Sequence, residues 1–132
     1  MSTRLSVFSS VILSAIFSVH AAEPASGQRL DEVAGRGAQV MPFSLERTTH
    51  VFTKTDLGGA QQVLAKDDGD QAQIALIRAH LSKIAREFQL GNFSDPARIH
   101  GDEMPGLAAL SAARPGQVDI AYKELPAGAE LD

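Results

Sequence analysis

Three histidines and one methionine are the residues of this chain whose chemistry most clearly suggests a site. His50, His80 and His100 lie on three different predicted elements, and Met104 follows His100 in the segment IHGDEMPG. Imidazole and thioether ligands suit copper, and a neighbouring carboxylate would extend the choice to zinc or nickel. If the fold brings them together, these four residues form a candidate site for copper or zinc.

Each candidate ligand also has a structural interpretation. At 100° per residue, His80 lies roughly 70° from the centre of the apolar stripe of its helix, which is typical of a boundary histidine bonded to a carbonyl or to water. His50 shares a strand face with Thr48 and Phe52, where a half-buried structural role is equally natural. Met104 could fill the core beneath the following helix, as methionine often does.

The sequence predicts no catalytic residue and no cofactor-binding residue. There is no cysteine, which excludes thiol nucleophiles, thiolate metal sites and disulfides. No G-x-S-x-G motif occurs, and Thr48 and His50 share a face without a third group to orient them. Gly58-Gly59 precedes no helix N-terminus that could bind a phosphate. The aspartates at 67–70 lack the ligand spacing of a calcium loop.

The clearest element in the chain is a helix over residues 70–90. Asp70 with Gln73 three residues later resembles a capping box, and Gly91 is a plausible residue to end the helix. An apolar stripe follows at helical spacing, formed by Ile74, Ile77, Leu81, Ile84 and Phe88.

Strands are predicted on both sides of this helix. Residues 43–55 and 61–66 form a hairpin around the turn at Gly58-Gly59, and residues 117–125 and 129–132 form a second pair. Short helices are expected at 94–100 and from Asp102 toward Ala113. The β-β-α-α-β-β order predicts an α+β fold, with a small antiparallel sheet and helices packed on one face.

The N-terminus predicts export, to the periplasm or the medium. Arg4 precedes an apolar stretch of about 15 residues, and Val19-His20-Ala21 permits cleavage after Ala21 or Ala22. The alternative is a membrane anchor, but a spanning helix needs about 20 mostly apolar residues. We therefore expect a signal peptide at 1–22, a flexible lead at 23–41 and a single domain at 42–132, with no membrane span after cleavage.

Composition limits the partners of the exported chain. Loss of Arg4 takes the net charge from −4 to −5, and no run of basic residues marks a nucleic-acid surface. The last strand, which stops at Asp132, is expected to leave an open sheet edge that could pair with another chain.

Three blocks resemble a group of small exported bacterial proteins of uncharacterised function, often automatically named aspartate carbamoyltransferase. They are MPFSLERTTHVFTKTDLGGAQQV, QIALIRAHLSKIAREFQLGNFSDPARIHGDEMPGLAAL and YKELPAGAEL, which together span about residues 41–131. The resemblance implies members that continue past this point with a completed strand and a helix containing aromatic and histidine residues. On that pattern, the chain is C-terminally shortened at Asp132.

The resemblance and the residues point to two functions of different classes. The first is an exported binding or accessory protein, with the four candidate ligands holding a transition metal. The alternative is a carbamoyltransferase, which that group's name implies. Such transferases use a Ser-Thr-Arg-Thr phosphate loop in a much longer chain, whereas the only Ser-Thr-Arg here is Ser2-Thr3-Arg4, where Leu5 follows.

Overall fold

The computed structural model describes residues 25–132, so the predicted signal peptide and its cleavage site lie outside the described residues. The elements are α1 (Gly27–Val40), β1 (Thr48–Lys54), β2 (Gly59–Ala65), α2 (Gln71–Gln89), α3 (Ser94–His100), α4 (Leu107–Ser111), β3 (Tyr122–Leu125) and β4 (Gly128–Leu131). No helix within this range is long and apolar enough to cross a membrane.

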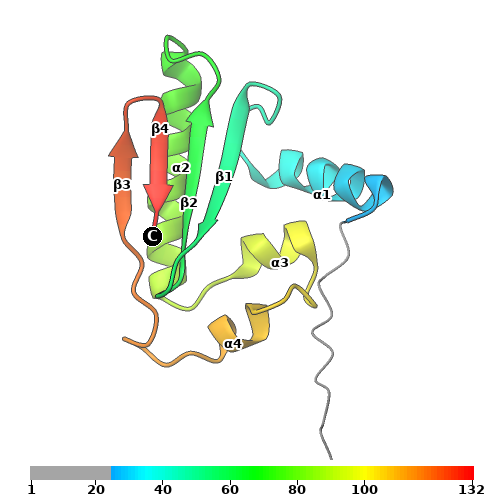
Figure 1. The fold of residues 1–132 in the computed structure, drawn as a ribbon, viewed down its shortest axis with the longest axis vertical. Coiled ribbons are helices and arrows are strands. Elements are labelled where there is room, and N and C mark those ends of the chain that lie inside the picture. The colour runs from blue at the N-terminus through cyan, green and yellow to red at the C-terminus, as the bar shows by residue number, and fades with distance from the viewer. Residues whose placement is uncertain (1–24) are drawn as a thin grey trace, which may run out of the picture.

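The strands form one antiparallel sheet in the order β1-β2-β4-β3 (Figure 1). Helix α2 lies along one face of this sheet and packs against β2, β4 and β3. The predicted α+β class, with a small antiparallel sheet and helices on one face, is confirmed.

Helix α2 supplies half of the buried core cluster. Asp70 caps its first turn by accepting a hydrogen bond from the Gln73 backbone N–H at 3.3 Å. The Gln73 side chain does not return to Asp70; its Oε1 accepts from the Ser44 N–H at 2.7 Å, which ties the helix to the segment before β1. Gly91 follows the helix with φ 76°, as its predicted role in ending the helix requires. The largest fully buried side chains are Val63, Ile74, Ile77 and Leu81.

The β1–β2 hairpin directs its inner face toward α2. His50 pairs with Val63 and Phe52 with Gln61. Because side chains alternate across a strand, Thr48, His50 and Phe52 share the face on which Val63 is fully buried. The register therefore brings a predicted ligand, His50, to the helix-covered side of the sheet.

The predicted open edge at the last strand is wrong. Strand β4 lies inside the sheet, pairing with β2 on one side and β3 on the other. The edges are β1 and β3. The reason is topological: the chain crosses from the β1–β2 hairpin to β3, and β4 then returns between β2 and β3.

The predicted flexible lead at 23–41 is also corrected, because most of it forms α1. Ser26 caps this helix by accepting from the Arg29 N–H at 3.3 Å. Gly37 is the buried residue of α1, and a Cβ there would lie 3.3 Å from the Leu45 side chain. The glycine thus lets the helix approach the chain just before β1, and residues 27–40 of the predicted lead are helical.

Three elements are shorter than the sequence predicts. The strand expected over 43–55 spans only Thr48–Lys54. The helix expected from Asp102 toward Ala113 spans Leu107–Ser111, because Pro105 precedes Gly106 in a left-handed conformation with φ 85°. The strand expected over 117–125 begins only at Tyr122. The Ala121 N–H donates to the Asp132 carbonyl at 2.7 Å. Hydrogen bonding to the last residue of the chain therefore begins at Ala121, one residue before β3.

Candidate functional site

A cavity of about 340 Å³ lies between the helices and the inner face of β1. Its walls come from every helix and from both strands of the hairpin, and they are mostly aliphatic, aromatic or thioether side chains. The lining residues are Val33, Ala34, Gly37, Met41, Leu45, His50, Phe52, Gln61, Phe88, Phe93, Pro96, Ile99, His100, Met104, Leu107 and Leu110. Phe52 is 70% exposed and also lines the cavity, so it lies at the rim.

Two arginines on α1 hold one wall of this cavity in place. Arg36 Nε donates to the Ile99 carbonyl at 2.8 Å, and Arg29 donates to the His100 carbonyl. The last carbonyls of a helix have no partner within the helix itself. The two arginines therefore donate to carbonyls at the C-terminal end of α3 and link α1 to α3 along one wall of the cavity.

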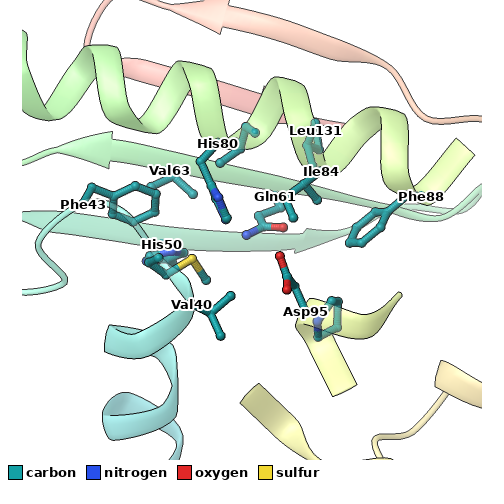
Figure 2. A pocket seen from close by; sticks show the side chains of 13 residues that line it. Val40, Phe43, His50, Gln61, Val63, His80, Ile84, Phe88, Asp95 and Leu131 are labelled. Atoms are coloured by element: carbon teal, nitrogen blue, oxygen red, sulfur yellow. The ribbon is translucent and has the colours of Figure 1, made fainter. Parts of the chain in front are cut away.

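A smaller cavity of about 50 Å³ adjoins the first, between α2, the hairpin and α3 (Figure 2). His80 extends from α2 and Asp95 from the start of α3 to line this space, and His50 lines it from β1. The two cavities share the walls formed by Met41, His50, Gln61, Phe88 and Pro96. His50 therefore stands at the junction between a small, partly polar space and a larger apolar one.

His50 and His80 both lie against the ring of Phe43. The ring centroids are 5.8 Å apart for Phe43 and His50, and 5.7 Å apart for Phe43 and His80, the latter edge to face. His80 is only 7% exposed, so it is a core residue and not the boundary residue that its helix angle suggested. Phe43 covers the flank of α2 on which His80 lies.

Burial governs the protonation of both histidines. Desolvation lowers the pKa of His50 and of His80 from the usual 6.5. For His80, the charges of Asp95 and Glu87 oppose this shift, whereas Lys83 and His50 reinforce it, and the net pKa is lowered. The uncharged imidazole is therefore the form that this part of the core favours.

Asp95 is the one acidic side chain at the smaller cavity, and its charge is already compensated. Its carboxylate lies 3.4 Å from Lys83 Nζ and 3.7 Å from Arg98 Nη1. Its side chain is 15% exposed. Asp95 therefore places a negative charge at this wall. The two cations beside it, Lys83 and Arg98, are already paired with its carboxylate.

The four predicted metal ligands do not gather at one point. His50 and His80 line the smaller cavity, whereas His100 and Met104 line the larger one together with His50. Within residues 25–132, no group of three or more His, Asp or Glu side chains could hold a metal ion. The three histidines therefore do not converge on a single ion, because His100 is held at the end of α3 beside Arg29.

Sequence reasoning missed most of the residues that line the larger cavity. Val33, Gly37 and Met41 come from the segment predicted to be a flexible lead, although their spacing matches one face of a helix. Ser26, three residues before Arg29, is a recognisable capping position. These two signals together could have identified α1.

We expect the folded protein to lose stability as the pH falls below about 6.5. The pKa values of His50 and His80 are lowered in the folded state, so below 6.5 the unfolded chain binds more protons. The contribution of these two histidines to the free energy of unfolding is thus constant above that pH and is lost below it. Urea unfolding at about pH 7.5, 6.5 and 5.5 measures the effect. His80→Gln should flatten the dependence, and stability that rises on acidification would contradict this account.

Comparison with protein-family models, with curated proteins and with solved structures gives no match for this chain. The resemblance to exported bacterial proteins stays a prediction. So does the carbamoyltransferase alternative, because Ser2-Thr3-Arg4 lies outside the described residues.

Proposed function

We propose that this protein is an exported binding protein that holds a small apolar molecule in the larger cavity. The observation that supports this proposal is the cavity itself, about 340 Å³ with a largely apolar lining drawn from six elements. Protein interiors leave few voids larger than a water molecule. Ligand pockets, by contrast, are about 300–1,000 Å³, mostly apolar, with a few polar groups.

The size of the cavity suggests the size of the ligand. A dry cavity of about 150 Å³ accommodates one benzene ring. A space of about 340 Å³ therefore suits a molecule of about two fused rings, or an aliphatic chain of similar bulk. The rim at Phe52 gives such a molecule an approach from the β1 edge.

Calorimetric titration of the purified chain with naphthalene tests the proposal. We expect saturable binding of one molecule per chain, with a negative heat-capacity change because apolar surface is buried. Heats that never saturate, or several weak equivalents per chain, would show surface association and would contradict the proposal.

A second candidate is a transition-metal ion held by His50 and His80, and it is favoured by their common position at the smaller cavity. Uncharged imidazoles are the form that binds copper or zinc. Titration with each metal, repeated on His80→Gln, tests it. One-site binding that the variant loses would support this candidate, and equal binding by both proteins would count against it.

A further inference from the structure

The two edges of the sheet differ in how they are protected from further strand pairing. Natural edge strands are commonly short, charged or covered. Strand β3 has four residues, and its two central ones, Lys123 and Glu124, are charged and exposed. Strand β1 has seven residues, of which only Lys54 at its end is charged. Residues 51–54 of β1 are all exposed, so this is the edge that can accept another strand.

The backbone of β1 presents unpaired groups along this edge. The Thr55 N–H donates to the Gly58 carbonyl at 3.1 Å. Because every second residue of an antiparallel pair bonds to the partner strand, the odd-numbered residues of β1 bond to β2. The N–H and C=O groups of His50, Phe52 and Lys54 therefore point away from the sheet. No backbone group outside the sheet bonds to them within residues 25–132.

The larger cavity opens beside the same edge. His50 and Phe52 line it from the inner face of β1, and Phe52 lies at its rim. Residues directly opposite each other in a sheet direct their side chains to the same face. A residue that pairs with Phe52 from outside therefore directs its side chain to the rim of the cavity. Sites that bind peptides by strand addition combine such an edge with pockets for alternate side chains.

We propose that this protein also binds an extended peptide, which adds to β1 as an antiparallel strand and places one aromatic side chain in the larger cavity. A row of N–H and C=O groups at strand spacing is matched by another polypeptide backbone. Indole has two fused rings, the bulk that suits a space of about 340 Å³. This inference rests on the proposed function, because the side chain occupies the same cavity.

The charge of Lys54 selects the sequence of the peptide. Lys54 is exposed and makes no ion pair within the described part of the chain. In the antiparallel register, the peptide residue two positions before the one opposite Phe52 lies opposite Lys54. An acidic residue there complements the lysine. Strand β1 itself has no acidic residue, so pairing with a second copy of β1 leaves Lys54 without a partner.

Titration of the full-length chain with the capped peptide Thr-Glu-Thr-Trp-Thr-Thr tests the proposal. We expect one peptide per chain and displacement of bound naphthalene. The Trp N–H, opposite Phe52, donates to β1, whereas the N–H of the following Thr points away. Methylation of the Trp nitrogen should therefore weaken binding by about tenfold, the loss of one hydrogen bond. Methylation of the next nitrogen is the matched control and should change affinity by no more than about twofold. Equal losses would overturn the proposal.

Two further peptides assign the side-chain contacts. With Ala in place of Trp, the peptide should no longer displace naphthalene. With Gln in place of Glu, it should bind about two- to fivefold more weakly, as expected for an exposed ion pair. Lys54→Gln should remove this preference for Glu, and Lys66→Gln, just after β2 and also exposed, should retain it. A preference that survives Lys54→Gln would contradict the proposed register.

The outcomes separate this inference from the proposed function. If naphthalene does not bind at one site, the proposed function fails. If naphthalene binds and the peptide does not displace it, only the peptide inference is overturned. Sedimentation tests the other occupant: a dimer that persists in excess peptide would assign the edge to a second copy and would also overturn the inference.

Amide exchange in the wild-type chain gives a readout that needs no variant. The N–H groups of Phe52 and Lys54 should exchange more slowly when the peptide is bound, because they become hydrogen-bonded. Those of Val51 and Thr53 already bond to β2 and should change little. Exchange at Phe52 and Lys54 that does not slow at saturating peptide would overturn the proposal.

Discussion

Gly128→Ala lowers the free energy of unfolding by about 3 kcal/mol or more, a large part of the roughly 5–15 kcal/mol that is typical of a folded domain. Gly128 opens β4, where it pairs with Leu64 of β2 and Leu125 of β3. A Cβ at this position would overlap the Val63 carbonyl oxygen and lie 3.1 Å from Leu64 Cα. Both neighbours are backbone atoms of a central strand, so neither can rotate away. The strands must separate instead.

Urea unfolding of the variant measures this loss, and Gly35→Ala is the matched control. Gly35 lies within α1, and nothing is within 4 Å of the Cβ position there. Alanine in a helix interior is more stable than glycine by about 0.5–1 kcal/mol. We therefore expect the same substitution to have opposite signs at the two positions. A Gly128→Ala protein as stable as the wild type would contradict the described pairing of β4.

Val33→Trp weakens the binding of an apolar ligand by at least about tenfold in affinity. Val33 lines the larger cavity from α1. An indole ring there occupies space that the ligand needs, and filling a cavity with an apolar group does not itself require loss of stability. Calorimetric titration with naphthalene, combined with a urea melt, separates blocked binding from unfolding.

Leu30→Trp is the matched control for this variant. Leu30 lies on the same helix, is 58% exposed and does not line the cavity. It should leave the affinity for naphthalene unchanged. Equal losses in both variants would mean that tryptophan on α1 disturbs the helix, and unchanged binding in Val33→Trp would place the ligand elsewhere.

Much of the sheet and its principal helix could be predicted because their signals are local. The cap at Asp70 and the apolar stripe from Ile74 mark α2 within the segment itself. The turn at Gly58 and Gly59 joins strands that are neighbours in sequence, so the β1–β2 register follows from the hairpin. The place of β4 depends instead on pairing with β2, which lies more than sixty residues earlier. No local pattern encodes that pairing.

The site was harder to predict because its walls come from distant elements. His50 and His80 were identified from their residue type, but their common contact with Phe43 depends on how the segment before β1 packs on α2. The cavity between α1, α3 and α4 depends on contacts such as Arg36 with the Ile99 carbonyl, sixty-three residues apart. Glycines 35 and 37 weaken the helical pattern of α1, which is why that wall was missed.

The most direct test of the binding proposal uses the methionine methyl groups as reporters. The chain has three methionines, of which Met41 and Met104 line the larger cavity from two connecting segments, one after α1 and one between α3 and α4. In a full-length chain labelled at the methionine methyls, naphthalene should shift the resonances of Met41 and Met104 together. Both shifts should saturate with a single dissociation constant. Resonances of Met41 and Met104 that do not move at saturating ligand would contradict the proposal that this cavity is the binding site.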